Sequence, residues 1–222
     1  MSISIAIDGP AGAGKSTIAK LAAKELGFIY VDTGALYRAI GLYAHRKGVK
    51  AADTQAVIAL LPEIRVELSF NESGAQIVLL NGEDVSGLIR TPEISMMASA
   101  VSAIPEVRAF LLDLQRDMAH TKNVIMDGRD IGTVVLPDAK LKIFLFASPE
   151  CRAKRRYDEL VEKGMDVRYD DVLKDVIDRD YADSHRAIAP LKPADDAVMV
   201  DTSGEDLDTS VNRLLTIMRE HI

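Results

Sequence analysis

The chain has 222 residues, a formal net charge of −7 and one cysteine, Cys151. The length suffices for one α/β domain with an insertion or lid. The acidic balance argues against a general nucleic-acid binder, and a lone cysteine excludes an internal disulfide and suits a reducing cytosol. Apolar runs are too short to span a bilayer, so we expect a cytoplasmic protein without a membrane segment or a cleavable signal.

The first predicted strand, residues 3–8, alternates isoleucine with small residues, as strands of a buried parallel sheet do. A phosphate-binding loop of the form G-x-x-x-x-G-K-S follows, made of Gly9, Pro10, Ala11, Gly12, Ala13, Gly14, Lys15, Ser16 and Thr17. A helix then runs to a stop at Gly27. This order of strand, loop and helix predicts a nucleoside triphosphate site, whereas the alternative is a glycine-rich turn that carries Lys-Ser by chance.

The chemistry of such a loop requires these residue types. Glycines let backbone N–H groups surround a polyphosphate, and the helix that follows adds free amides. Lys15 would reach the β- and γ-phosphates, and the Ser16 hydroxyl would ligate Mg²⁺.

A second strand, at 28–31, leads into Asp32 and a helix that extends to about Lys47. Ligands of open α/β sheets lie beyond the carboxyl ends of the strands, where Asp32 falls. Arg38 lies in the first turns of the helix, an end that disfavours cations. Its position indicates an anionic ligand, with a solvated surface arginine as the alternative.

The middle of the chain interrupts the α/β alternation with a small antiparallel β insertion. The pattern predicts a helix at 53–61, followed by two hairpin strands at 64–70 and 76–80 that are joined by a turn at 71–74. A further turn is predicted at 81–84 and a third strand at 85–89. This insertion either closes over a ligand or extends the core.

The second half returns to helices and buried strands. Helices are predicted from Thr91 and from Pro105, then over 148–163, 169–182 and 207–217, with strands at 123–127, 141–147 and 197–201. An apolar strand that ends on Asp127 is typical of the acid that supports Mg²⁺ in P-loop folds, with a salt-bridged turn as the alternative. The cations Arg152, Lys154, Arg155 and Arg156 form either a solvated helix face or a lid that brings guanidinium groups to phosphates. Five parallel strands with helices between them predict a P-loop α/β fold.

The sequence resembles the bacterial-type cytidylate kinases, a family of P-loop nucleoside monophosphate kinases. The matching segments span almost the whole chain: IDGPAGAGKST at 7–17, DTGALYR at 32–38, NGEDVSGLIRTPE at 81–93, DGRDIGTVVLPDA at 127–139 and HRAIAPL at 185–191. The P-loop alone specifies only a triphosphate binder, whereas its combination with DGRDIGT and the hairpin insertion is specific to this family.

The resemblance implies a P-loop fold with a five-stranded parallel sheet flanked by helices, an inserted antiparallel β subdomain and a helical lid. Within one domain, 1–222, we expect a core at 1–32, 104–150 and 187–222, an NMP-binding part at 33–103 with its insertion at about 63–90, and a lid at about 151–186. The implied reaction is transfer of a phosphoryl group from ATP to CMP or dCMP. We expect a monomer whose partners are these nucleotides, with no nucleic acid and no membrane.

The resemblance also implies residue roles. The acceptor CMP would be bound by Thr33, Arg38, Ser99, Arg108, Arg129, Asp130, Arg179, Asp183 and Arg186. Catalytic charge neutralisation would come from Lys15, Arg129, Arg155 and Arg186. Mg²⁺ would be held by Ser16, with Asp127 supporting it through a water. Thr33 stands where many members have Ser, and it keeps the hydroxyl group.

The chemistry of cytosine supports this assignment independently. Cytosine carries an exocyclic amino donor beside ring acceptors, and Asp130 with Arg108 and Ser99 supplies an acceptor and donors. A phosphate oxygen of CMP is already anionic, so no general base is needed, and catalysis reduces to alignment and charge neutralisation. A lid that closes only over both nucleotides would suppress ATP hydrolysis.

Three rival functions fit the sequence less well. The nearest rival is a P-loop kinase for another nucleotide or for a metabolite alcohol. A kinase for an alcohol would need a base such as Asp32 or Asp127, and the many arginines favour an anionic acceptor. A GTP switch would need an Asn-Lys-x-Asp motif, which the chain lacks. A nucleic-acid motor conflicts with the acidic balance, and the four histidines lack metal-ligand spacing. The sequence leaves open the preference between CMP and dCMP, tolerance of UMP, oligomeric state and the dominant lid arginine.

Overall fold

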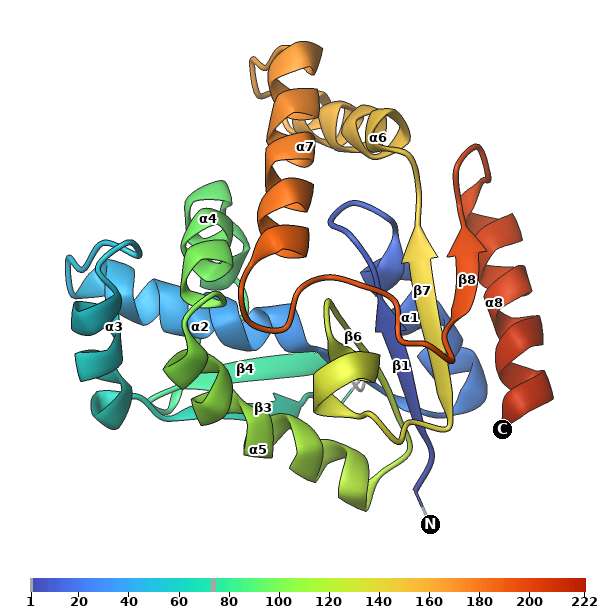
Figure 1. The fold of residues 1–222 in the computed structure, drawn as a ribbon, viewed down its shortest axis with the longest axis horizontal. Helices are drawn as coiled ribbons and strands as arrows, with labels where there is room; N and C mark the ends of the chain where they lie inside the picture. Colours follow the sequence, from blue (N-terminus) through green and yellow to red (C-terminus); the bar gives the residue numbers. More distant parts are fainter. Residues whose placement is uncertain (1, 73–74) are drawn as a thin grey trace.

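A five-stranded parallel sheet forms one half of the molecule in the computed structural model, which describes residues 2–72 and 75–222 (Figure 1). Its strand order is β2-β6-β1-β7-β8, and each neighbouring pair is parallel. The strands are β1 (Ser4–Asp8), β2 (Ile29–Asp32), β6 (Val124–Gly128), β7 (Leu141–Phe146) and β8 (Val198–Asp201). The predicted five parallel strands are confirmed.

The central strand β1 is buried on both faces, because helices cover both sides of the sheet. Ile5 and Ile7 pack with α1 (Lys15–Leu26) and α8 (Leu207–His221) on one face. Ala6 packs on the other face with the end of α5 (Pro105–Thr121) and a π-helical turn, η3 (Ile131–Val135). The alternation of β1 side chains thus joins two hydrophobic layers, and the strand ends at the edge where the P-loop begins.

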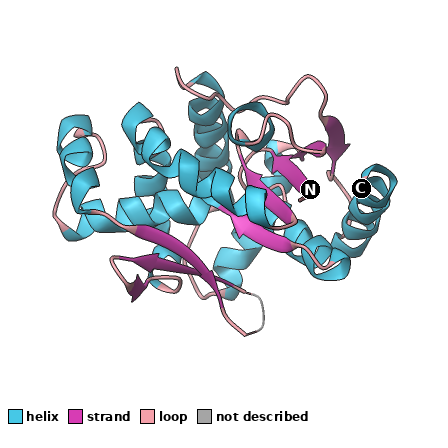
Figure 2. Ribbon diagram, turned by 90° about the horizontal axis from the view of Figure 1, so that it is seen from below, coloured by secondary structure: helices cyan, strands magenta, loops and turns pink. Residues whose placement is uncertain are grey.

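The other half of the molecule packs helices against a small antiparallel sheet, which lies apart from the parallel strands in Figure 2. The elements are α2 (Thr33–Arg46), α3 (Thr54–Leu60), η1 (Leu61–Glu63), β3 (Val66–Phe70), β4 (Gln76–Leu80), β5 (Glu83–Asp84), η2 (Leu88–Arg90) and α4 (Pro92–Val101). Leu36 and Ile40 of α2, Val78 of β4 and Leu111 of α5 belong to one core cluster. The insertion therefore extends the core of this half.

The prediction of a third strand at 85–89 was wrong, since β5 occupies residues 83–84 within the predicted turn. Asn81 and Gly82 have positive φ values of 50° and 85°, which close a tight turn between β4 and β5. Val85 and Ile89 are then fully buried in the core, and the chain coils into η2 there. Of the other predicted turn, at 71–74, positions 73 and 74 lie outside the described residues.

Two helices, α6 (Pro149–Glu162) and α7 (Tyr169–His185), project from the sheet and share a small core around Ala153, Leu160 and Val172. Helix α7 continues three residues beyond the predicted Ala182. Among the described helices, none alone is long and apolar enough to cross a membrane. Only α4 and α5 taken together have the required length and composition, and they are bent by 100°.

Candidate active site

The P-loop connects the end of β1 to the start of α1 and is shaped by its glycines. Gly9, Gly12 and Gly14 have φ values of 147°, 75° and 90°, which side chains rarely adopt. A Cβ on Gly9 would lie 1.9 Å from the Leu145 carbonyl oxygen. Two further contacts hold the loop: the Ala13 carbonyl accepts from the Thr202 hydroxyl, and Pro10 accepts from Lys15. Thr17 is exposed on the first turn of α1.

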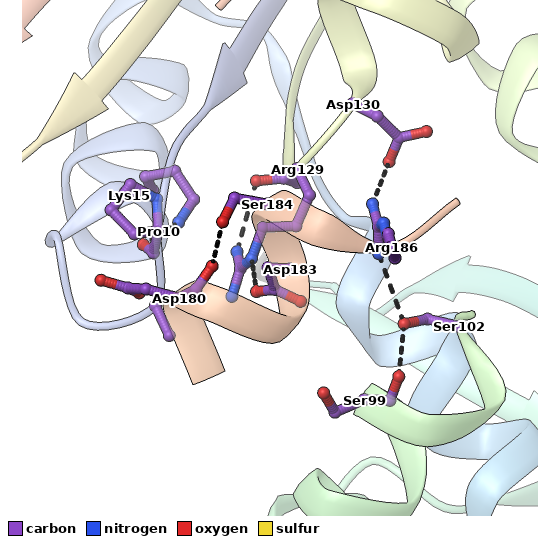
Figure 3. Close-up of polar contacts among 12 residues, drawn as sticks. Pro10, Lys15, Ser99, Ser102, Arg129, Asp130, Asp180, Asp183, Ser184 and Arg186 are labelled. Carbon is purple, nitrogen blue, oxygen red and sulfur yellow. Dashed lines mark hydrogen bonds and ion pairs between the residues drawn. The ribbon is translucent and has the colours of Figure 1, made fainter. Parts of the chain in front are cut away.

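Lys15 is buried at the base of this loop, and its Nζ donates to the Pro10 carbonyl oxygen at 2.7 Å (Figure 3). Burial and the nearby Arg129 lower the pKa of Lys15 to about 7, against the opposing effect of Asp127 and Asp8. Because the protein alone stabilises the charged form of Lys15 poorly, an anionic ligand beside its ammonium group would be bound favourably.

Ser16 and Asp127 meet at the ends of α1 and β6. The Ser16 hydroxyl donates to Asp127 Oδ2 at 2.7 Å, and Tyr30 donates to Oδ1 at 3.0 Å. Burial and the neighbouring Asp32 raise the pKa of Asp127. A hydroxyl beside a carboxylate in a phosphate loop is a donor set that suits Mg²⁺, which takes its remaining ligands from phosphates and water. Among the described residues, no cluster of three or more His, Cys, Asp or Glu side chains could hold a metal alone.

Asp8, the last residue of β1, connects the P-loop to the segment after β6. Its two carboxylate oxygens accept from the backbone N–H groups of Ile131 and Gly132, both at 2.7 Å. Burial raises the pKa of Asp8 to about 6 despite these bonds. The same carboxyl group therefore sets the position of η3 relative to the P-loop.

Asp32 gathers two arginines at the start of α2. It caps the helix by accepting from the Ala35 N–H, and its Oδ2 accepts from Arg38 Nη2 at 2.7 Å and Arg90 Nη2 at 3.3 Å. The Arg38 side chain is 19% exposed and its Nε is buried without a hydrogen-bond partner. Arg38 is therefore not a solvated surface arginine. Gln76 of β4 exchanges hydrogen bonds with the Asp32 backbone, so the β insertion also reaches this site.

Asp130 is the centre of a second buried polar group, drawn in Figure 3. It forms a hydrogen-bonded ion pair with Arg108 and lies 3.6 Å from Arg186 Nη2. Arg108 also lies over the Tyr37 ring. Burial and the neighbouring Arg108 lower the pKa of Arg186. Ser99 joins this group through its carbonyl oxygen, which accepts from Ser102.

Several positively charged side chains lie between the P-loop and the two groups around Asp32 and Asp130. Arg129 Nε donates to Asp183 Oδ2 at 2.9 Å, and its proximity to Lys15 contributes to the lowered pKa of that lysine. Arg179 Nε is buried without a hydrogen-bond partner. Burial lowers the pKa of Arg179, helped by Arg129 and Arg38 nearby. Burial acts to raise the pKa of Asp183, yet the Arg129 guanidinium beside it keeps the pKa below its ordinary value.

Thr33 is the first residue of α2 and is buried. Its hydroxyl donates to the Asp127 carbonyl oxygen at 2.8 Å. A Cβ on Gly128 would lie 2.8 Å from the same hydroxyl. Of the predicted acceptor residues, the structure thus brings Arg108, Asp130 and Arg186 into one group and Arg129, Arg179 and Asp183 into another, whereas Ser99 joins through its backbone carbonyl oxygen.

The cationic residues of α6 are of two kinds, those on exposed surface and those bonded near the P-loop. Lys154 and Arg156 pair with Asp158 and Glu159 on exposed surface, as the solvated-face alternative expects. Arg155 Nη2 donates to the Thr202 carbonyl at 2.8 Å, and its Nη1 lies at the P-loop beside Gly14.

Arg152 has its guanidinium bonded to groups of the protein itself. Its side chain is 2% exposed and donates to the carbonyl oxygens of Ala147 and Ala11 and to the Asp180 carboxylate. Ala11 belongs to the P-loop and Asp180 to α7. This arginine is a fixed connection between the P-loop and helices α6 and α7.

The match to known proteins covers nearly the whole chain. The model of the family described as cytidylate kinase matches residues 5–220. The chain is 50% identical to a cytidylate kinase of Caldicellulosiruptor saccharolyticus over 97% of this chain and 95% of that protein. The chain belongs to the cytidylate kinase family. A family member from Streptococcus gordonii is also 50% identical, over 94% and 93% of the two chains.

A solved structure of an uncharacterized protein from Eubacterium ventriosum has a TM-score of 0.53 and 13% identity, over 98% of this chain and 99% of that one. This likeness concerns the fold alone.

Several residues of this family member reach the site without having been predicted. Arg90 lies within the NGEDVSGLIRTPE segment at 81–93, and that segment was the available signal for it. Gln76 and Ser102 carry no local signal, because their partners are distant in sequence. Asp8, a polar residue that ends a buried strand, could have been found by the reasoning that found Asp127.

Proposed function

We propose that this protein transfers the γ-phosphoryl group of ATP to CMP and dCMP, giving ADP and CDP or dCDP. The observation that carries the proposal is the buried Asp130 carboxylate, paired with Arg108 and Arg186 on the acceptor side of a complete P-loop. The family membership of the chain supports the same reaction.

The donor ATP occupies the loop from Gly9 to Thr17 in this proposal. Lys15 leaves the Pro10 carbonyl for the β- and γ-phosphates, and the loop amides and the start of α1 bind the remaining oxygens. Ser16 would hold Mg²⁺, with Asp127 supporting it through a water. The ion would neutralise charge on the β- and γ-phosphates and orient them.

The acceptor phosphate lies among Arg38, Arg129 and Arg179, with Arg186 approaching from the lid side. Arg38 Nε and Arg179 Nε are buried polar atoms without partners, and a phosphate supplies the missing acceptors. Arg155 adds charge at the donor side of the transferred group. A phosphate oxygen of CMP is already a nucleophile, so these residues contribute alignment and charge neutralisation.

Asp130 reads the base. Its carboxylate accepts from the exocyclic amino group of cytosine, while Arg108 and Ser99 serve the ring acceptors. Uracil has a carbonyl in place of the amino group, so an acceptor oxygen would face the carboxylate where cytosine offers a donor. Asp183 and Arg179 approach the sugar, and the Thr33 hydroxyl lies beneath the acceptor.

The division of the chain follows from these roles. Residues 1–32, 104–150 and 187–222 form the core, 33–103 the NMP-binding part and about 151–186 the lid. We further propose a cytoplasmic monomer that acts on nucleotides only, without nucleic acid or membrane. The lid closes when both nucleotides are bound and so suppresses ATP hydrolysis. A high rate of ATP hydrolysis without acceptor, little changed by removal of Arg155, would contradict lid closure.

The test is steady-state phosphoryl transfer from Mg-ATP to CMP, dCMP, UMP, AMP and GMP side by side. The proposal expects strong preference for CMP and dCMP. Equal transfer to UMP would contradict base reading by Asp130, and transfer to none of them would contradict the acceptor class.

A further inference from the structure

Ser102 follows the last turn of α4 and is buried between three residues with proposed acceptor roles. Its hydroxyl bonds the Ser99 carbonyl, its own carbonyl accepts from Arg108 Nη1 at 3.1 Å, and Arg186 Nη1 points at its Oγ (Figure 3). One small side chain therefore connects α4 to the segment that follows α7.

The direction of each hydroxyl bond is fixed by proton count. Ser102 has one hydroxyl proton, and it is used on the Ser99 carbonyl oxygen at 2.8 Å. Only lone pairs remain to face Arg186 Nη1, 3.5 Å away, and a guanidinium has only donors. The two contacts are compatible in this arrangement and in no other.

Arg186 is in turn held at two of its three nitrogens. Nε donates to the Ala189 carbonyl at 2.7 Å, and Nη1 faces Ser102. The third nitrogen, Nη2, is buried without a hydrogen-bond partner and lies 3.6 Å from Asp130 Oδ1. Because the guanidinium is planar, fixing two nitrogens determines where the third points. Nη2 is thus presented beside the carboxylate that reads the base.

We propose that Ser102 is a positioning residue for base recognition, whose hydroxyl orients Arg186 so that Nη2 meets the acceptor beside Asp130. This inference rests on the proposed function, because it takes the acceptor to be a cytidine monophosphate. In the contacts described above, Ser102 touches neither the P-loop nor Arg38, Arg129 or Arg179, and it meets Arg186 through Nη1 rather than Nη2. Its loss therefore affects binding and selection of the acceptor more than the chemical step.

The chain offers a matched control on the same helix. The Ser95 hydroxyl donates to the Thr91 carbonyl at 2.8 Å, a bond of the same kind near an exposed helix start. Ser95→Ala removes this bond at a distance from Arg186, whereas Ser102→Ala removes the hydroxyl that faces Arg186. The bond from Arg108 to the Ser102 backbone is available in both variants.

The first test compares steady-state kinetics of the two variants with the wild type. Ser102→Ala should raise the KM for CMP about fivefold, the effect of one hydrogen bond, and lower the CMP-over-UMP ratio of kcat/KM. The kcat with CMP and the KM for ATP should change less than twofold, and Ser95→Ala should match the wild type. An unchanged KM for CMP, or an equal fall of kcat for CMP and UMP together with a lower Tm, would overturn the proposal.

The second test asks whether Ser102 acts through Arg186. In an Arg186→Gln background, Ser102→Ala should add no further loss of CMP affinity in calorimetry, because the oriented group is gone. A further fivefold loss there would overturn the proposal. A wild-type protein that phosphorylates neither CMP nor dCMP would contradict the proposed function itself, and one that uses UMP as well as CMP would contradict base reading by Asp130. A cytosine-selective wild type with an unaffected Ser102→Ala variant would contradict only the role of Ser102.

Discussion

The donor loop and the acceptor cluster, defined here as Asp32, Arg38, Arg90, Arg108, Arg129, Asp130, Arg179, Asp183 and Arg186, are built in different ways. The loop is one continuous segment whose shape comes from positive φ values and from Gly9 pressed against β7. The cluster is assembled from elements far apart in the chain. Arg108 and Asp130 are 22 residues apart, Arg129 and Asp183 are 54 apart, and Arg90 and Asp32 are 58 apart.

This difference separates two kinds of consequence. A substitution in the loop changes backbone conformation beside the central sheet and so affects folding and ATP binding together. A substitution in the cluster changes a charge or a hydrogen bond and so affects the acceptor. Arg152 is the exception, because it bonds both the loop and α7. Variants can therefore impair the donor loop and the acceptor cluster separately or together.

The largest effect is expected for Gly9→Ala. The added Cβ would overlap the Leu145 carbonyl oxygen in a conformation that strains any side chain, so we expect a loss of about 3 kcal/mol in unfolding free energy and no measurable ATP binding. Chemical denaturation and nucleotide calorimetry measure both. Gly87→Ala is the matched control, since Gly87 has a φ of −77° and open space around it. Equal stability of the two variants would contradict the role given to Gly9.

Arg152→Met should weaken both regions at once. It removes the hydrogen bonds to Ala11, Ala147 and Asp180 from a buried position, so we expect a loss of about 3 kcal/mol in stability and a higher KM for both nucleotides. Lys154→Met, on the exposed face of the same helix, should leave Tm and both KM values unchanged. A variant with normal stability and only a reduced kcat would instead place Arg152 on the transferred phosphate.

Arg90→Ala should affect the acceptor alone. Arg90 is 55% exposed and bonds only Asp32 among the contacts described, so its loss should raise the KM for CMP about tenfold through one charge-assisted bond, with the KM for ATP unchanged. Arg65→Ala removes an exposed arginine that precedes β3 and serves as the control. A larger effect on ATP than on CMP would contradict the position assigned to Arg90.

The smallest effect is a proton taken up when ATP binds. Lys15 has a pKa of about 7 in the free protein, and phosphate oxygens around it would raise that pKa. Above pH 7 the complex then holds more protons than the free protein, so ATP affinity falls as pH rises from 7 toward 10. Calorimetry at pH 8 in two buffers of different ionisation enthalpy should show uptake of about one proton. Lys15→Met should lack this uptake and Lys20→Met should retain it; the reverse would contradict the assignment.

Prediction from sequence succeeded for elements whose structure depends on residues near one another in the sequence. The helix from Lys15 to Leu26 and its stop at Gly27 follow from local spacing and a positive φ. The prediction of a third strand at 85–89 was wrong because the turn at Asn81 and Gly82 is tighter than the polar pattern suggests. The third strand therefore starts at Glu83, and the chain has turned into η2 by Leu88.

The same distinction between local and long-range dependence applies to the residues of the candidate site. Asp127 and Asp32 were predicted from their places at strand ends, and the structure brings both there. The acceptor residues came from the family resemblance, since no spacing rule places Asp130 next to Arg186. Ser102 and Gln76 were missed because each depends on a partner more than 40 residues away. Arg152 was correctly placed on its helix, but only the structure shows that its guanidinium is already occupied.

The most direct test of this account is the ratio of kcat/KM for CMP and for UMP, measured in the wild type and in Asp130→Asn. We expect the wild type to prefer CMP by a factor on the order of 10⁴, since uracil would place an acceptor oxygen against the buried carboxylate where cytosine places a donating amino group. Asp130→Asn should reduce this ratio about 100-fold with the KM for ATP unchanged. A wild type that uses both acceptors equally, or a variant that keeps the full preference, would contradict the conclusion that the acceptor cluster selects cytosine through Asp130.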